Sequence, residues 1–334
     1  MYSGLSGTVS VYRHRMKRRV IALDAGGTKL LVGVSDDAGE ILYRTVLGWP
    51  RDAVRDDVLL RFQSAVTEAR RHVGEIDAIG VGLPATMDRA DGIAVASRHL
   101  PIAGFGFRDW LAADAGLPVY VDNDATLALL AEHRRGAARG ALDALLLTIG
   151  TGIGGGLMTS GRLVHGAYGA AGEPGHMTID ADGPPCRGDC PGRGCLEVYV
   201  SGPALAEMGY EYAAKGPDYN LGRMLDANGE LTAADVVHAA RVGDPGAYEA
   251  LMRMGEKLGI GLASLVNLLD PELVVIGGGL GSDANELLIE PAERVVRERA
   301  LEPAASAVRI VPAELGEEAG MIGAALLALA EGEV

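Results

Sequence analysis

The segment VDNDA at residues 121–125 places two carboxylates and one amide between an apolar run and a stretch with helical spacing. Asn and Asp are preferred at helix N-caps, so capping explains one of these three residues. Phosphoryl transfer to an alcohol needs a carboxylate that accepts the hydroxyl proton, beside groups that bind the phosphate. Asp124 is therefore a candidate general base, with a capping role as the alternative.

Two glycine-rich turns join strand-like segments, DAGGTK at 24–29 and TIGTGIGGG at 148–156. Successive backbone N–H groups in tight turns form anion-binding concavities, to which threonine hydroxyls add donors. Residues 150–155 fit G-x-G-x-x-G, but their continuation is too glycine-rich for the helix of a dinucleotide-binding fingerprint. The two turns predict that both halves of the chain bind a polyphosphate between them. The alternative is that they are ordinary hairpin turns.

Asp24 ends the first strand-like segment, two residues before Gly26. A carboxylate beside a phosphate loop would repel phosphate unless a cation lies between them, and Mg²⁺ takes oxygen ligands. We therefore expect Asp24 to hold Mg²⁺, directly or through water.

The motif EPGH at 173–176 places Glu173 and His176 in a glycine-rich loop. Each sugar hydroxyl can donate and accept a hydrogen bond, so polar side chains of this kind suit a sugar ligand. A purely structural histidine is the alternative.

All three cysteines lie within PPCRGDCPGRGC at 184–195, at positions 186, 190 and 195. Three thiols are too many for one disulfide and one ligand short of a four-cysteine metal site. His176 can be the fourth ligand, because three thiolates and one imidazole make a closed, structural Zn²⁺ site. A reduced trio without metal is the alternative.

Composition limits the partners. The net charge is −15, which argues against nucleic acid or an anionic membrane as the main partner. We see neither a signal peptide nor an apolar run of the roughly 20 residues that a membrane span needs. The sequence therefore predicts a soluble, cytoplasmic protein, with residues 1–19 as a flexible basic tail ending in YRHRMKRR.

The elements that must position these residues follow from hydrophobic spacing. Strands are predicted within 20–48, 76–84, 117–122, 144–158, 273–277 and 308–312. Helices are predicted at 54–73, 107–115, 124–135, 202–214, 232–242, 246–269, 285–299 and 317–330. The run at 144–158 echoes the first hairpin, so an α/β protein with a mixed sheet in each of two lobes and a cleft between them is expected.

The ordered set of motifs resembles the ROK family of sugar kinases, which share the actin-like ATPase (ribonuclease H-like) fold. Beyond the motifs above, the match includes GLPA at 82–85, CPGRGCLE at 190–197, IGGG at 276–279 and EEAGMIGAA at 317–325. The resemblance implies a small lobe at 20–121 that also takes the C-terminal helix 317–334. It implies a large lobe at 122–316 with a zinc-binding loop at 173–197, and a homodimer.

The resemblance also implies roles for single residues. Asp124 would be the general base for transfer from ATP to a sugar hydroxyl, typically the 6-hydroxyl. The sugar ligands would be Asn123, Asp124, Glu173, His176, Glu197, Ala85 and His99. ATP and Mg²⁺ would lie against Asp24, Gly26, Gly27, Thr28, Lys29, Thr148, Gly150, Thr151, Gly152, Gly277, Gly278 and Gly279. Structural Zn²⁺ would be held by His176, Cys186, Cys190 and Cys195, with the second ring nitrogen of His176 toward the sugar.

Three positions depart from the family pattern. Ala85 replaces a glycine, His99 replaces an asparagine, and three residues instead of one separate Cys186 from Cys190. Glucose is the expected substrate, with N-acetylmannosamine, N-acetylglucosamine, mannose and fructose as alternatives. A sugar-responsive repressor is less expected, because only 23 residues precede Asp24 and they show no helical apolar pattern. A non-catalytic scaffold would have no use for EPGH and Glu197.

Overall fold

The computed structural model describes residues 18–187, 190–215 and 220–334. The predicted basic tail therefore lies outside the described residues up to residue 17. Arg19 is already the first residue of strand β1 (Arg19–Ala25), one residue earlier than expected. Within the described residues, no helix is both long and apolar enough to cross a membrane.

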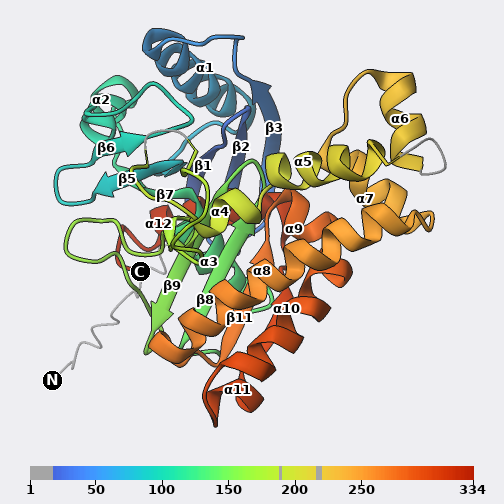
Figure 1. Cartoon of the computed structure of the whole chain (residues 1–334). Helices are drawn as coiled ribbons and strands as arrows, with labels where there is room; N and C mark the ends of the chain where they lie inside the picture. The colour runs from blue at the N-terminus through green and yellow to red at the C-terminus, as the bar shows by residue number, and fades with distance from the viewer. Residues whose placement is uncertain (1–17, 188–189, 216–219) are drawn as a thin grey trace, which may run out of the picture.

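Two five-stranded sheets form the frame of the molecule (Figure 1). The first contains β1, β2 (Lys29–Asp36), β3 (Ile41–Gly48), β4 (Ala78–Leu83) and β7 (Val119–Asn123), in the order β3-β2-β1-β4-β7. The second contains β8 (Ala144–Ile149), β9 (Ile153–Thr159), β10 (Arg162–Leu163), β11 (Leu273–Gly277) and β12 (Arg309–Pro312), in the order β10-β9-β8-β11-β12. Each sheet contains an antiparallel hairpin, β1–β2 in the first sheet and β8–β9 in the second. Beside the first strand of each hairpin lie two further strands that run parallel to it, β4 and β7 in the first sheet and β11 and β12 in the second.

Helices cover both sheets, because alternate side chains of the central strands point to opposite apolar faces. Helices α1 (Arg55–Val73) and α2 (Phe107–Ala115) pack on the outer face of the first sheet, where Ile21 and Leu23 are buried. Helices α8 (Pro245–Leu269) and α10 (Asn285–Arg299) cover the outer face of the second sheet. Figure 1 shows α5 (Gly202–Ala213), α6 (Asn220–Asn228) and α7 (Ala233–Arg241) extending to one side.

A third apolar cluster lies between the two sheets. It contains α3 (Asp124–Arg135) and α12 (Ala319–Leu329), together with inward side chains of both sheets such as Ala22 and Leu146. Buried Glu132 of α3 accepts the backbone N–H groups of Ala137, Glu314 and Leu315, at 2.8, 3.2 and 2.9 Å. This carboxylate therefore ties the end of α3 to the chain that leads into α12.

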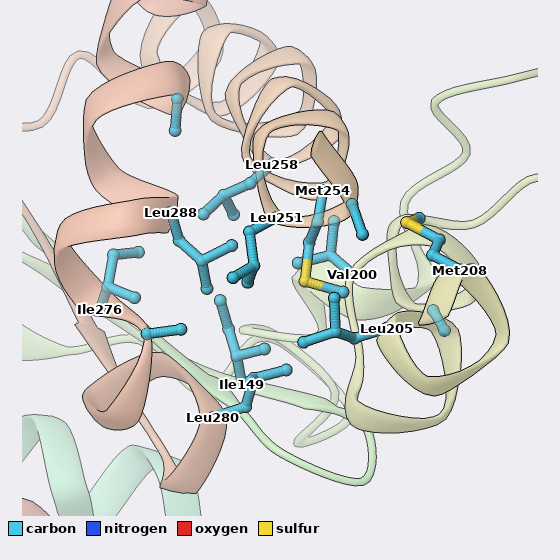
Figure 2. Close-up of a cluster of buried hydrophobic side chains, with 14 of the residues drawn as sticks. Ile149, Val200, Leu205, Met208, Leu251, Met254, Leu258, Ile276, Leu280 and Leu288 are labelled. Carbon is cyan, nitrogen blue, oxygen red and sulfur yellow. The ribbon is translucent and has the colours of Figure 1, made fainter. Parts of the chain in front are cut away.

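The core of the second half anchors one of the glycine turns. In Figure 2, Leu251, Met254 and Leu258 of α8 face Ile149 at the end of β8, with Leu280 and Leu288 closing the group. Ile149 and Leu288 are fully buried. The turn that begins at Gly150 therefore leaves a packed core, which fixes the point from which its backbone N–H groups project.

The predicted sheet strands and the eight long predicted helices are present, within a few residues of their expected ends. The sequence reading missed the hairpin β5 (Ala85–Asp88) and β6 (Ile93–Ser97), the strand β10, and the helices α4 (Leu196–Tyr199), α6, α9 (Gly279–Asp283) and α11 (Ala304–Ala307). These elements are short, and hydrophobic periodicity needs about 11 residues or more to become visible.

Candidate active site

A cleft of about 580 Å³ is lined by residues from both halves of the chain. The predicted site residues on its wall are Gly27, Thr28, Ala85, His99, Asn123, Asp124, Thr148, Gly150, Thr151, Gly152, Glu173, His176, Cys190, Glu197 and Gly278. The remaining ones, Asp24, Gly26, Lys29, Gly277, Gly279, Cys186 and Cys195, lie outside this lining. The cleft therefore joins both glycine turns, the acidic junction and the EPGH loop in one space.

Asp124 is the first residue of α3, directly after β7. Asn123 provides the cap, because its Oδ1 accepts the backbone N–H of Thr126 at 2.9 Å. Oδ1 of Asp124 accepts the N–H of Ala125 at 2.9 Å. Burial raises the pKa of Asp124 to about 7, and the negative charge of Glu173 acts in the same direction. Capping is thus assigned to Asn123, and Asp124 can exchange a proton near neutral pH.

Asp24 lies at the end of β1, beneath the floor of the cleft. A Cβ placed on Gly320, at the start of α12, would be 2.4 Å from Oδ2 of Asp24, so the helix approaches this carboxylate closely. Burial raises the pKa of Asp24 to about 8, the charge of Asp124 adds to the rise, and Lys29 opposes it. A cation beside these two acids would oppose both rises and favour their ionised forms.

The first glycine turn is closed by backbone and indole hydrogen bonds. The N–H of Gly26 donates to the carbonyl of Lys29 at 2.9 Å, and Nε1 of Trp49 donates to the carbonyl of Gly26 at 2.8 Å. Lys29 does not line the cleft; its Nζ pairs with Glu317 at 2.7 Å. Gly27 faces the imidazole of His99, 3.5 Å from a Cβ placed on the glycine.

The second glycine turn packs against two other segments. The N–H of Gly202 donates to the carbonyl of Gly150 at 2.7 Å, and Oε2 of Glu197 accepts the N–H of Ile153 at 2.8 Å. Gly278 has φ +80°, and a Cβ there would lie 2.5 Å from the backbone of Ile149. Both the left-handed φ and the close contact require glycine at position 278. The contact with Ile149 also shows that the IGGG turn lies beside the second glycine turn.

Arg98 is a polar residue of the cleft that the sequence reading missed. Its Nη1 lies 3.1 Å from Oε1 of Glu197 and 3.4 Å from Nε2 of His176, and its Nη2 donates to the carbonyl of Arg187 at 2.5 Å. Arg98 therefore reaches from the segment after β6 to the loop that carries the cysteines. The only sequence signal was its position directly before His99.

Two other polar groups of this wall have shifted pKa values. Burial, together with the charge of Arg98, lowers the pKa of His99. Burial raises the pKa of Glu173, with His176 opposing the rise. These shifts favour the neutral form of His99. They also make Glu173 hold a proton more readily than an exposed carboxylate does.

The three cysteines and His176 form one cluster. Their ligand atoms all lie within 4.8 Å of one another, and Nδ1 of His176 is 3.6 Å from Sγ of Cys186. Around one Zn²⁺, with bonds of about 2.0–2.3 Å, such atoms lie ~3.5–4 Å apart, so a small contraction suffices. Burial and the neighbouring thiols raise the pKa of Cys186 to about 12, so these thiols would ionise together only around a cation. The donor set fits structural Zn²⁺, despite the longer Cys186–Cys190 spacing.

Comparisons with known proteins agree with this geometry. A model described as "ROK family" matches residues 20–331. A glucokinase of Halalkalibacterium halodurans is 34% identical over 313 residues, which cover 92% of this chain and 93% of that protein.

Solved structures extend the likeness to three dimensions. A ROK family glucokinase from Streptomyces griseus, in complex with glucose and AMPPNP, aligns with a TM-score of 0.82 and 31% identity, covering 93% of this chain and 99% of that one. A ROK family transcriptional regulator aligns with a TM-score of 0.85 and 28% identity, covering 95% of this chain and 80% of the regulator. The predicted actin-like ATPase fold is thereby confirmed.

Proposed function

This chain belongs to the ROK family, and we propose that it is an ATP-dependent glucokinase that phosphorylates glucose at the 6-hydroxyl. The observation that carries the proposal is the position of Asp124. It lies in one cleft with both glycine turns and with the polar wall of Glu173, His176 and Glu197. Relatives with this fold include proteins named glucokinase, and one of them binds glucose and AMPPNP.

In the proposed reaction Asp124 accepts the proton of the sugar 6-hydroxyl. The hydroxyl oxygen attacks the γ-phosphorus in line, the bond from that phosphorus to the β-γ bridging oxygen breaks, and ADP leaves. A base with a pKa of about 7 suits this task, because about half of it is deprotonated at neutral pH and that form is strongly basic for a carboxylate.

The glycine turns form the nucleotide side of the proposed site. Backbone N–H groups of residues 26–28 and 150–152, with the hydroxyls of Thr28 and Thr151, would bind the phosphates. Gly278 and its neighbours would face the adenosine. Asp24 would hold Mg²⁺ directly or through water, and Mg²⁺, when bound, neutralises phosphate charge.

The opposite wall would bind the sugar. With a metal on Nδ1, the proton of neutral His176 lies on Nε2, which then donates. The guanidinium of Arg98 also donates, and its Nη1 is 3.4 Å from that nitrogen. A sugar oxygen between them would accept from both, with Glu197 beside it as an acceptor. Asn123, Glu173, Ala85 and His99 would complete the wall.

The direct test is a coupled ADP-release assay with MgATP and glucose, N-acetylmannosamine, N-acetylglucosamine, mannose or fructose. We expect the highest kcat/KM with glucose, and an Asp124→Asn preparation purified in parallel controls for contaminating kinases. A kcat/KM for N-acetylmannosamine far above that for glucose would replace the substrate assignment and keep the kinase. No ADP release with any sugar would refute the proposed function.

The structural Zn²⁺ has its own test. Protein purified without chelator should contain about one zinc per chain by metal analysis, and Cys195→Ser should lose it. In the proposed role the zinc holds Glu173, His176 and Glu197 in place, so zinc-depleted protein should lose sugar affinity and retain nucleotide affinity. Well under one zinc per chain with full sugar affinity would contradict this role.

The homodimer that the family resemblance implies stays a prediction. Sedimentation equilibrium at micromolar concentration would test it, with a mass of twice 34.6 kDa as the expected result and a single-chain mass as the contrary one.

A further inference from the structure

Asp122 is a buried carboxylate directly behind the cleft. Its side chain is 1% exposed, and in the sheet it is paired with Gly82 of β4. An ionised carboxylate this deeply buried is stable only with charged or hydrogen-bonding partners. Asp122 does not line the cleft, so substrate contact does not explain it.

Two basic side chains complete a closed triangle with Asp122. Oδ2 of Asp122 is 2.8 Å from Nε2 of His165 and 3.3 Å from Nε of Arg89. Nη1 of Arg89 is 3.2 Å from Nδ1 of His165. Arginine can only donate, so Nδ1 must accept, and the ring proton then lies on Nε2 and is donated to Asp122. Neutral His165 satisfies all three groups at once.

The three residues come from segments that meet at the sugar side of the cleft. Arg89 lies in the turn between β5 and β6, the hairpin that begins at Ala85 and ends just before Arg98. His165 lies after β10, on the segment that leads to Glu173. The same segments also touch at Gly169, where a Cβ would lie 1.9 Å from the carbonyl oxygen of Met87. The triangle thus connects the β5–β6 hairpin to the segment that follows β10.

Asp122 connects this triangle to Asn123, the residue before Asp124. Its Oδ1 accepts the N–H of Asn123 at 2.8 Å. Asn123 caps α3 and donates from Nδ2 to the carbonyl of Ala85 at 3.4 Å. A displaced Asp122 would therefore reorient the peptide between Asp122 and Asn123, one residue before Asp124, and small displacements of a reacting group are costly.

We propose that Arg89, His165 and Asp122 form a brace of positioning residues, which holds the β5–β6 hairpin against the loop of residues 164–172 and thereby orients Asn123 and Asp124 toward the sugar. The proposal rests on the proposed sugar kinase activity for its kinetic consequences. Its structural core, one hydrogen-bonded unit with His165 neutral and protonated at Nε2, can be tested without activity.

The kinetic test uses Arg89→Ala, Arg89→Lys and Asp122→Asn in the full chain, with Arg294→Ala as a matched control that removes the exposed Arg294–Glu256 pair. We expect Arg89→Ala to lower kcat/KM for the sugar at least tenfold, with KM for MgATP within twofold of wild type. Arg89→Lys should recover part of the loss, and the control should behave as wild type.

A double-mutant cycle then separates a unit from independent contacts. If the brace acts as one unit, Asp122→Asn with Arg89→Ala loses no more kcat/KM than the worse single variant. If the double variant instead loses kcat/KM by the product of the two single losses, the residues act independently and the idea of one unit is wrong. If Arg89→Ala lowers Tm but leaves kcat and the sugar KM within twofold of wild type, the triangle is structural only and the positioning role is wrong.

A spectroscopic test is independent of the proposed function. In ¹⁵N-histidine-labelled protein, the His165 signal, assigned by its loss in His165→Gln, should show the Nε2–H neutral tautomer at pH 7. Arg89→Ala should disturb that signal. An Nδ1–H tautomer would overturn the brace. Absence of ADP release from wild type, with the expected tautomer, would instead refute only the kinase activity.

Discussion

The two halves of the molecule share one sheet topology but differ in the side chains at equivalent positions. In the first sheet Asp24 of β1 pairs with Gly82 of β4, and in the second Thr148 of β8 pairs with Gly277 of β11. Asp24 and Thr148 therefore occupy the same place, directly before a glycine turn. Both hairpins are antiparallel, and both open toward the cleft.

The difference lies in charge. The first half places Asp24, Asp122 and Asp124 around the carboxyl ends of its parallel strands. In the second sheet, the corresponding end has Thr148 on β8 and Pro312 on β12. The second half instead anchors its turn through the buried Ile149 and through Glu197 of helix α4. Under the proposed function, the shared backbone would support proton and metal chemistry in the first half and phosphate binding in the second.

The largest effect is expected from Asp124→Asn, which removes the base and keeps the shape. Loss of general base catalysis costs about 10²–10⁴-fold in turnover. We expect kcat to fall by this order, with sugar binding by calorimetry within a few fold of wild type. Turnover near that of wild type would show that Asp124 is not the base.

The same variant should be more stable at alkaline pH. In the wild-type protein, folding raises the pKa of Asp124 from 3.8 to about 7. Between these pH values the folded protein therefore binds more protons than the unfolded chain. Stability therefore falls as pH rises through this range. Asp124→Asn removes that penalty and should have a higher Tm than wild type at pH 8, with the difference vanishing near pH 4.

The next effect compares Asp24→Asn with Thr148→Val at the equivalent position. Asp24 is expected to hold Mg²⁺, so its loss should lower kcat on the order of tenfold or more and raise the Mg²⁺ concentration needed for half-maximal rate. Thr148→Val should leave the Mg²⁺ dependence unchanged. Equal Mg²⁺ titrations for the two variants would contradict this division of roles.

The sequence predicted the repeated hairpins because their apolar runs and glycine turns are local signals. It also predicted the cluster of His176 with three cysteines, since ligand chemistry restricts the choices. It could not predict the partners of Lys29 or Glu132, because Glu317 and Glu314 lie 288 and 182 residues away. Arg98 and the Arg89–His165–Asp122 triangle were missed for the same reason: each depends on loops brought together only by tertiary packing.

A smaller effect distinguishes the glycines of the two turns. A Cβ at Gly152 would lie 2.4 Å from Oε2 of Glu197, whereas one at Gly26 would lie 3.6 Å from its nearest neighbour and one at Gly150 would meet nothing within 4 Å. None of the three has a left-handed φ. Glu197 cannot move freely, since Ile153 and Arg98 hold it.

We therefore expect Gly152→Ala to raise the sugar KM about tenfold, the cost of disturbing one well-held polar contact. Gly26→Ala should leave the sugar KM unchanged, and Gly150→Ala should change only the KM for MgATP. These constants come from initial rates with one substrate varied at saturating levels of the other. A sugar KM raised equally by all three changes would show that the turns are not specialised.

The smallest effect is a shift in the pH profile. The pKa values of about 8 for Asp24 and about 7 for Asp124 place the acid limb of kcat/KM near pH 7 to 8, with activity lost as pH falls and the base is protonated. Glu173 raises the pKa of Asp124 through its charge. Glu173→Gln should therefore move the limb to lower pH, by a fraction of a unit to one unit. Glu256→Gln, which removes the same charge from the exposed pair with Arg294, is the matched control. A limb that stays in place or moves upward in Glu173→Gln would show that Asp124 does not set it.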